Sequence, residues 1–467
     1  MKMNLSRIYF CTGARNHDLL KVMENIPTYF EYDERVASFK ALGFSKVSSA
    51  PVAICTTSGT AVSETVSAML EAYYSEAPLV LITGDRPKKL HGTGSPQTVD
   101  HELLTRGVRR DYVEISLKDL GSLTLEGLKF PVHINVLVDD TIPHEFKTLR
   151  HDSMDGFKSF IQKFSRPLFL FSHEHTSMRD FVHKFSEQEL PFYAESLSGG
   201  RELSSIKTEK MLLSLFKRGE FDSIIKVGHT PLSKLWRLLE KTPLPVFSFD
   251  SRGLSGLSYG EILPWGSKEL LSSSEFWKTL EELKKRDFSG HDKKELHELI
   301  VKYPQSEISL FSQLQDHFLE DDSIYLGNSL VIRFFELTQK KKFRLYGNRG
   351  VNGIDGQLSS AMGVASGVKN KVYAILGDVT TFYDLSSLIQ MPENLRLIII
   401  NNKGGRIFDM LNLDKRIVLE HDNNFKKITE GMGLTYSSDI TKFGEVQVLE
   451  LFPDPKETQS FLEEWNT

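Results

Sequence analysis

The sequence predicts an α/β protein made of three consecutive doubly wound domains, each with a parallel sheet. Short apolar runs alternate with stretches of helical spacing along the whole chain, and such runs are typical of strands buried on both faces of a parallel sheet. The 467 residues correspond to about three domains at ~150 residues each. We expect an N-terminal domain at 1–146, a small central domain at 147–300 and a C-terminal domain at 301–467.

The composition excludes several classes of protein. The 57 Lys and Arg are outnumbered by 62 Asp and Glu, giving a formal charge of −5, which argues against a predominantly basic surface for nucleic acid. The two cysteines, Cys11 and Cys55, are too few for a disulfide framework and fit a reducing compartment, so we expect a cytoplasmic protein. The longest apolar stretches, such as 77–83 and 395–400, are too short to span a membrane.

The first domain is predicted from a regular alternation of strands and helices. Its apolar runs predict strands at 8–11, 28–32, 52–56, 79–83 and 132–138. Helical spacing with few breakers predicts helices at 36–46 and 60–74. The polar, weakly periodic stretch 148–158 is expected to be the first linker.

The other two domains repeat the alternation. In the central domain we predict strands at 167–172, 191–195, 223–227 and 245–250, with helices at 209–217 and 232–240. The charged segment 278–302 predicts a solvated helical connection into the last domain. There the predicted strands are 323–326, 344–346, 372–376, 395–400 and 446–451.

Two strand ends of the last domain carry the residues most suited to chemistry. Gly377 and Asp378 follow one strand, and Asn401 to Gly405 follow the next. Because parallel strands end at the same sheet edge, where ligands of doubly wound folds bind, we expect Asp378 and Asn402 to face one point. A carboxylate, an amide oxygen and a nearby backbone carbonyl, such as that of Gly404, suit Mg²⁺ or Mn²⁺. Helix caps and turns use the same residue types, which is the simpler alternative.

At this spacing the chain resembles the thiamine-diphosphate-dependent enzymes, and its closest resemblance is to the MenD family, the 2-succinyl-5-enolpyruvyl-6-hydroxy-3-cyclohexene-1-carboxylate synthases of menaquinone biosynthesis. The resemblance rests on residues 327–333 (GNSLVIR), 347–356 (GNRGVNGIDG) and 401–408 (NNKGGRIF). It also rests on 33–35 (DER), 55–62 (CTTSGTAV) and 84–87 (GDRP), followed by Gln97. It covers the first and last domains and is weak in the central one.

The resemblance implies a catalytic role for Glu34. This carboxyl would hydrogen-bond the aminopyrimidine ring of the cofactor and relay the proton that activates it. A solvated glutamate at a helix start is the alternative. For the rest of the cofactor, the resemblance implies binding by Ser329, Gly377 and the Thr380 hydroxyl, with Ile354 or Ile407 as the apolar support. Either isoleucine is equally suited to plain core packing.

The implied substrates are 2-oxoglutarate and isochorismate, which bring several carboxylates into one pocket. Arginine suits carboxylates because its planar fork donates two parallel hydrogen bonds. Matching the family motifs residue by residue gives the implied substrate-binding side chains Arg15, Arg86, Gln97, Lys234, Arg333 and Arg349.

The reaction that the resemblance implies is decarboxylation of 2-oxoglutarate, followed by conjugate addition of the succinyl carbanion to isochorismate. Two alternatives stay open. The altered loop around Arg15, and Leu235 where the family often has a second basic residue, are compatible with a decarboxylase or carboligase that uses another acceptor. The short front and small central domain are compatible with a non-catalytic cofactor-binding homologue. Family architecture further implies a homodimer or homotetramer with active sites at the subunit interface, and no nucleic-acid partner.

Overall fold

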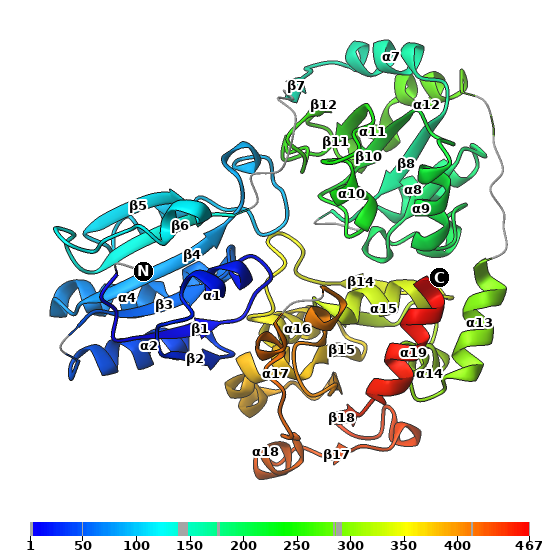
Figure 1. The fold of residues 1–467 in the computed structure, drawn as a ribbon. Coiled ribbons are helices and arrows are strands. Elements are labelled where there is room, and N and C mark those ends of the chain that lie inside the picture. Colours follow the sequence, from blue (N-terminus) through cyan, green and yellow to red (C-terminus); the bar gives the residue numbers. More distant parts are fainter. Residues whose placement is uncertain are drawn as a thin grey trace. The chain divides into compact units, whose positions relative to one another are not determined.

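The computed structural model contains three six-stranded sheets, and every strand pairing in them is parallel. It describes residues 3–48, 50–138, 148–174, 178–283, 285, 292–411 and 414–466. The described residues form two compact units. One contains the chain up to residue 138 together with Val351–Asp355 and Lys403–Asn423, and the other contains the remainder. Figure 1 shows the ribbon, and the predicted class of three parallel α/β domains is confirmed.

The N-terminal sheet has the strand order β2-β1-β3-β4-β6-β5. Its strands are β1 (Arg7–Cys11), β2 (Thr28–Glu31), β3 (Val52–Thr56), β4 (Leu79–Asp85), β5 (Asp111–Ser116) and β6 (Val132–Leu137). β3 and β4 are buried throughout, as their continuous apolar sequence predicts. The chain runs from β1 outward to β2 and then back to β3, so the order reverses between β1 and β3. Ligands of doubly wound sheets bind at such a reversal.

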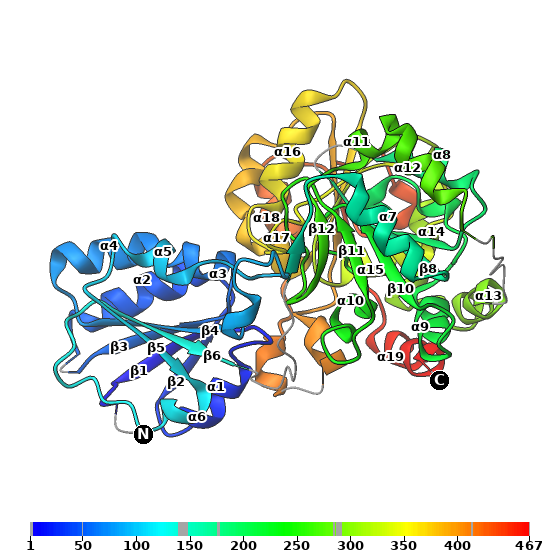
Figure 2. The same cartoon turned by 90° about the horizontal axis from the view of Figure 1, so that it is seen from above.

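Helices cover both faces of this sheet. Figure 2 shows α2 (Glu34–Ser45) and α4 (Val66–Ser75) on one face, and α1 (His17–Val22) and α6 (Leu117–Leu120) on the other. Ala41 and Met69 pack in the first of these layers, and Leu19 and Leu120 in the second. The predicted helix 60–74 is divided into α3 (Thr60–Glu64) and α4, with Thr65 between them.

The second unit begins with the central sheet, whose order is β7-β12-β11-β10-β8-β9. Its strands are β7 (Thr148–Arg150), β8 (Pro167–Phe171), β9 (Phe192–Ala194), β10 (Ser223–Val227), β11 (Val246–Phe249) and β12 (Gly260–Leu263). The linker expected at 148–158 is wrong, because this stretch holds the exposed edge strand β7 and the start of α7 (Met154–Lys163). The boundary expected at 146/147 lies outside the described residues.

Helices also cover the central sheet on two sides. One layer is rich in phenylalanine and includes α7, α8 (Arg179–Ser186), α11 (Ser267–Ser272) and α12 (Ser274–Leu280). The other contains α9 (Glu209–Lys217) and α10 (Lys234–Leu238). Of the charged connection expected at 278–302, the described part ends in α13 (Asp292–Lys302); residues 284 and 286–291 lie outside the described residues.

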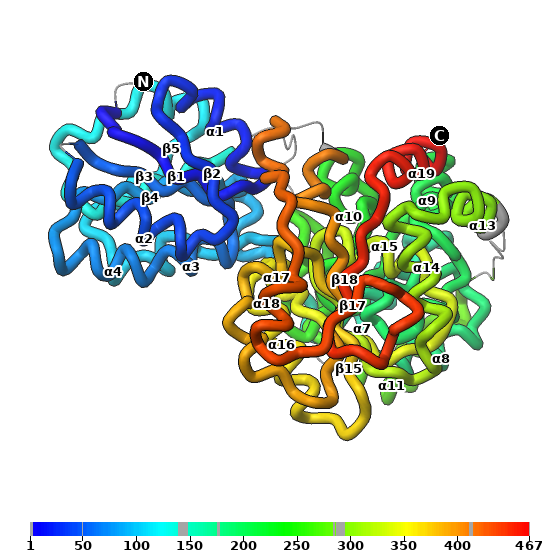
Figure 3. Tube along the Cα trace, turned by 90° about the horizontal axis from the view of Figure 1, so that it is seen from below, coloured from blue at the N-terminus to red at the C-terminus, as the bar shows by residue number. Residues whose placement is uncertain are grey.

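The C-terminal sheet has the order β14-β13-β15-β16-β18-β17. Its strands are β13 (Ser323–Leu326), β14 (Arg344–Tyr346), β15 (Val372–Gly377), β16 (Leu395–Ile400), β17 (Tyr436–Ser437) and β18 (Val448–Leu451). Among its helices are α14 (Glu307–His317), α15 (Leu330–Thr338), α16 (Gln357–Gly367), α17 (Asp378–Tyr383) and α19 (Pro455–Asn466). Figure 3 traces α13, α14 and α19, which lie beside one another. Here the strand order reverses between β13 and β15.

Candidate functional site

The predicted metal ligands lie at the carboxyl edge of the C-terminal sheet. Gly377 at the end of β15 pairs in register with Ile400 at the end of β16, so the residues that follow these strands start from the same level of the sheet. Asp378 is 2% exposed and begins α17. Its Oδ1 accepts a hydrogen bond from the Val379 backbone N–H at 2.7 Å. The sheet register therefore starts the Asp378 and Asn402 segments side by side. That their two side chains face one point stays a prediction.

A buried carboxyl, Glu307, connects to this edge from α14. Asn402 Nδ2 donates a hydrogen bond to Glu307 Oε2 at 2.9 Å. Burial raises the pKa of Glu307 to about 7; the hydrogen bond from Asn402 opposes this rise, and the negative charge of Asp378 adds to it. Sequence reasoning missed Glu307, because a glutamate directly after a serine cap is an ordinary helix start.

Gly404 occupies a backbone conformation that glycine favours, with φ of +134°. A Cβ atom at this position would lie 2.6 Å from the Val418 carbonyl oxygen, so no larger residue fits without movement of the backbone. The Gly404 carbonyl accepts a hydrogen bond from the Arg406 N–H at 2.9 Å. The expected role of this carbonyl as a metal ligand stays a prediction.

The other predicted cofactor residues are divided between the two compact units. Ser329 lies directly before α15 with φ of +67°, and Thr380 is buried in α17. Ile354 and Ile407 are half-buried and belong to the two segments that group with the N-terminal sheet. The expected role of Ile354 or Ile407 as the apolar support of the cofactor therefore stays a prediction.

Those two segments are attached to the N-terminal sheet by specific contacts. Thr60 Oγ1 donates to Asp355 Oδ1 at 2.6 Å, and Tyr32 Oη donates to the Leu419 carbonyl at 2.8 Å. Ile417 is buried in the core beside α1. Residues far along the chain thus complete the first compact unit.

Glu34 is the first residue of α2, after the cap Asp33, whose side chain accepts the Val36 N–H at 3.0 Å. Its side chain is 6% exposed, so the alternative of a solvated glutamate is wrong. Burial is the largest cause of the raised pKa of the Cys11 thiol at the end of β1, and the charge of Glu34 raises it further. Glu34 thus lies near the carboxyl end of β1, and its catalytic role stays a prediction.

Arg15 and Gln97, both predicted to bind substrate, are in direct contact. Arg15 Nη1 donates to Gln97 Oε1 at 2.7 Å and to Ser58 Oγ at 2.8 Å, and Nη2 donates to the Pro96 carbonyl at 3.1 Å. Arg15 follows β1 and Ser58 follows β3, so this cluster occupies the reversal point of the N-terminal sheet. Arg86 directly follows β4, and its backbone N–H donates to Asp85 Oδ1 at 2.7 Å.

A polar network that the sequence did not indicate lies behind this cluster. Asn135 Nδ2 donates to Asp85 Oδ2 at 3.0 Å, and His101 Nδ1 lies 2.8 Å from Asn135 Oδ1. The Gly59 N–H donates to His101 Nε2 at 3.5 Å. Burial lowers the pKa of His101, so its neutral ring can accept this bond. The network supports the turn that begins at Ser58, and its members are scattered in sequence without a recognisable spacing.

Two predicted arginines lie around the turn after β13. Arg349 Nη1 donates to Asn328 Oδ1 at 2.6 Å, and Arg333 donates to the Ser329 carbonyl. Burial lowers the pKa of both guanidinium groups, and Arg333 is further affected by the charge of Arg349. Both remain charged at working pH because arginine is not deprotonated in proteins. Both arginines therefore lie around the same turn, and their expected role in substrate binding stays a prediction.

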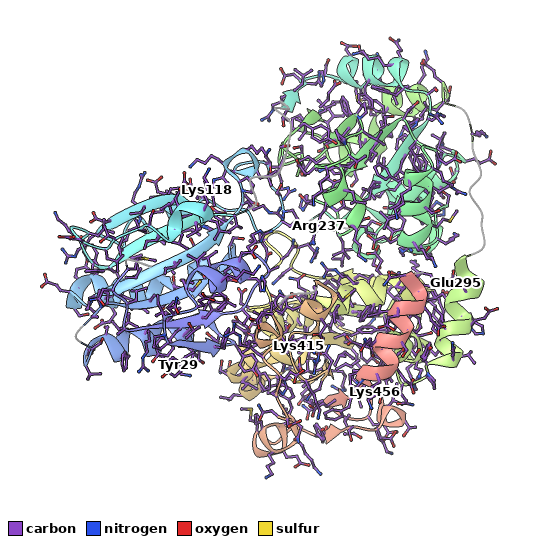
Figure 4. All side chains as sticks on the ribbon, in the orientation of Figure 1. Tyr29, Lys118, Arg237, Glu295, Lys415 and Lys456 are labelled. Atoms are coloured by element: carbon purple, nitrogen blue, oxygen red, sulfur yellow. The ribbon has the colours of Figure 1, made fainter. Side chains whose placement is uncertain are left out.

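Carboxyl groups that sequence reasoning missed lie near these arginines. The charges of Glu195 and Glu336 oppose the lowering of the Arg349 pKa. Glu195 Oε1 also accepts the backbone N–H of Ser233 at 2.9 Å. The predicted Lys234 follows, but its side chain is exposed, as is that of Arg237 on the same helix (Figure 4). Leu235 is fully buried in the core of the central domain.

Two further findings concern metal ions and membranes. Within the described ranges, no group of three or more His, Cys, Asp and Glu side chains is arranged to hold a metal ion. This finding does not concern a site built from one carboxylate, one amide oxygen and one backbone carbonyl, because only one of those three ligands comes from a side chain of these four types. Among the helices in the described part of the chain, none is long and apolar enough to cross a membrane.

Comparisons with known proteins agree with these observations. Residues 1–104 match the family model described as "Thiamine pyrophosphate enzyme, N-terminal TPP binding domain". The chain is 31% identical to the 2-succinyl-5-enolpyruvyl-6-hydroxy-3-cyclohexene-1-carboxylate synthase of Bdellovibrio bacteriovorus, covering 98% of this chain and 94% of the relative. It is 30% identical to the enzyme of the same name from Akkermansia muciniphila, with 96% and 93% covered. It is 29% identical to the enzyme of the same name from Bacillus velezensis, covering 86% of this chain and 80% of the relative.

Proposed function

The chain belongs to the 2-succinyl-5-enolpyruvyl-6-hydroxy-3-cyclohexene-1-carboxylate synthase family of thiamine-diphosphate-dependent enzymes, and on that premise we propose that it joins 2-oxoglutarate to isochorismate. Carbon dioxide leaves 2-oxoglutarate, and the remaining four-carbon fragment adds to the ring of isochorismate. The product is the compound for which the relatives are named. The observation that carries the proposal is the set of cationic side chains at the carboxyl edges of the sheets.

The residues at the edge of the C-terminal sheet fit the diphosphate of the cofactor and a divalent metal ion. Asp378 and Asn402 offer the hard oxygen ligands that Mg²⁺ or Mn²⁺ prefers. Glu307 Oε1 is buried and has no hydrogen-bond partner among the described residues, as is expected where a ligand completes the polar contacts. Asp378, Asn402 and the Gly404 carbonyl would hold the metal, and Ser329, Gly377 and Thr380 would contact the cofactor. When bound, thiamine diphosphate supplies the electron sink for decarboxylation and the nucleophilic carbon for addition.

Glu34 would hold the activating proton at its carboxyl. A buried carboxyl that is hydrogen-bonded to a ring nitrogen stays near the balance between its protonated and ionised forms, which suits a proton relay. The low exposure of Glu34 supports this role.

The two substrates bring four carboxylates, which the predicted cations would bind and orient. Arg15, held by Ser58 and Gln97, is fixed in position before substrate arrives. Arg349 is fixed in the same way by Asn328. Such preorganisation reduces the entropic cost of binding.

We further propose that two chains associate, so that Glu34 of one chain serves the cofactor held by the C-terminal domain of the other. Large apolar side chains that are exposed on the first unit support this arrangement, because association would remove them from water. They include Val36 and Phe39 of α2, Leu70 and Tyr74 of α4, and Tyr29 of β2 (labelled in Figure 4). Cys11 and Cys55 are both unpaired thiols and buried, which supports a reducing compartment such as the cytoplasm.

The test is to incubate the purified chain with 2-oxoglutarate and isochorismate, with and without thiamine diphosphate and Mg²⁺. We expect carbon dioxide release and the adduct mass only when the cofactor and both substrates are present. No carbon dioxide from 2-oxoglutarate, with cofactor demonstrably bound, would contradict the proposed donor.

A second candidate is a carboligase of the same cofactor class with another donor or acceptor. The burial of Leu235 favours it, because this position offers no second cation next to Lys234. A screen of 2-oxo acids and acceptors separates the two, and a strong preference for pyruvate would select this candidate.

A further inference from the structure

We propose that Glu307 is a positioning residue that fixes the orientation of the Asn402 amide, so that its oxygen is presented to the divalent metal. This inference rests on the proposed function, because it needs the metal site of Asp378 and Asn402. Neither the motif that identified those two residues nor the names of the relatives assign a role to Glu307.

Glu307 is fixed in position by a hydrogen bond of its own backbone and by the helix cap that precedes it. It follows Ser306, whose side chain caps α14 by accepting the Ser309 N–H at 3.2 Å. Its own backbone N–H donates to Thr458 Oγ1 of α19 at 2.9 Å. The side chain is 2% exposed, so it has little freedom to turn away from Asn402.

A side-chain amide has one donating and one accepting end, whereas a carboxyl oxygen that carries no proton only accepts hydrogen bonds. The 2.9 Å contact between Asn402 Nδ2 and Glu307 Oε2 therefore selects one orientation, in which the NH₂ group faces Glu307 and the carbonyl oxygen faces away. In the opposite orientation the NH₂ group would point at the cation and could not bind it.

Such outer partners are common at metal sites, and their removal typically weakens metal affinity by about 10–100-fold. A partner that merely filled space would not have this effect.

The test measures Mn²⁺ binding in the presence of thiamine diphosphate, by electron paramagnetic resonance of the free ion, without any turnover. We expect Glu307→Gln to weaken Mn²⁺ binding by about 10-fold, because glutamine can donate as well as accept and so satisfies either amide orientation. Asp378→Ala sets the scale of the complete loss. Thr458→Val is the matched control, since it disturbs the same helix start but leaves the Asn402 contact. We expect it to bind Mn²⁺ within about 2-fold of the unmodified chain.

A double-mutant cycle separates positioning from general support of the fold. In the Asn402→Asp background the side chain has two equivalent oxygens and needs no orienting partner. Glu307→Gln should there cause no loss, and should improve binding by removing a repulsive carboxylate. A merely structural role would cost the same in both backgrounds.

Three results would overturn the inference: unchanged Mn²⁺ affinity in folded Glu307→Gln, an equal loss in Thr458→Val, or an equal loss in both backgrounds of the cycle. Should the unmodified chain itself take up no Mn²⁺ with the cofactor, the metal site of the proposed function fails and this inference falls with it. Loss confined to the variants leaves the proposed function intact. Thermal unfolding of each variant confirms that it is folded.

Discussion

Replacing Gly404 by alanine tests whether the turn after β16 is built to bring its backbone close to a ligand. At φ of +134° a side chain is strained, and such conformations cost about 1–3 kcal/mol each. The added Cβ would lie 2.6 Å from the Val418 oxygen and 3.1 Å from the Leu419 oxygen. Because both neighbours are backbone atoms, they can yield only if the turn itself moves.

The strain in Gly404→Ala should lower either the free energy of unfolding or the affinity for the cofactor. If the turn stays in place, the free energy of unfolding falls by about 1–3 kcal/mol. If the turn moves, the cost appears as weaker cofactor binding, by roughly 10-fold for each 1.4 kcal/mol. The two effects are measured by urea denaturation and by titration of thiamine diphosphate at fixed Mg²⁺.

Gly363→Ala is the matched control, because Gly363 lies within α16 and a Cβ there would meet nothing within 4 Å. It should stabilise the fold by about 0.5–1 kcal/mol. If Gly404→Ala matched the unmodified chain in both stability and cofactor affinity, the reasoning about this turn would be refuted.

Three further predictions follow from the site. Glu34→Gln should lower turnover by about 10²–10⁴-fold while cofactor binding is partly retained, and an unchanged rate would remove Glu34 from the mechanism. Arg349→Lys should raise KM for the acidic substrates by about 10-fold, because lysine lacks the planar fork, whereas Arg344→Lys on the exposed edge of β14 should not. A hydrogen bond to Asp85 raises the pKa of His91. The stabilisation of the fold by this hydrogen bond is therefore complete below the ordinary histidine pKa of about 6.5, and it is lost as the pH rises through the raised pKa. The difference in unfolding free energy between the unmodified chain and His91→Gln should therefore shrink from about pH 6 to 8; a difference that grew would contradict this pairing.

Much of the fold was predictable because the central strands are continuous apolar runs. β3, β10, β13 and β16 were predicted with their observed bounds. β5 was missed because Asp111–Ser116 is half-buried and lacks an apolar run. Edge strands of this kind are stabilised by pairing with a neighbour, which a local pattern does not reveal.

The site was predictable only where sheet geometry or a motif connects distant residues. Asp378 and Asn402 follow paired strands, so the common sheet edge from which their segments start follows from the parallel register. Glu307 contacts Asn402 across 95 residues of sequence, and nothing local distinguishes it from other helix-start glutamates. The contact between Arg15 and Gln97 spans 82 residues, and only the family motifs gave both residues the same expected role.

The attachment of Val351–Asp355 and Lys403–Asn423 to the first unit has a consequence for biosynthesis. Ile417 fills part of the core beside α1, yet it leaves the ribosome long after the strands of that sheet. At 5–20 residues per second the wait is about 15–60 s. During this time the nascent first sheet exposes apolar surface, which makes it a substrate for chaperones, and a gene fragment ending near residue 350 would yield an aggregation-prone product.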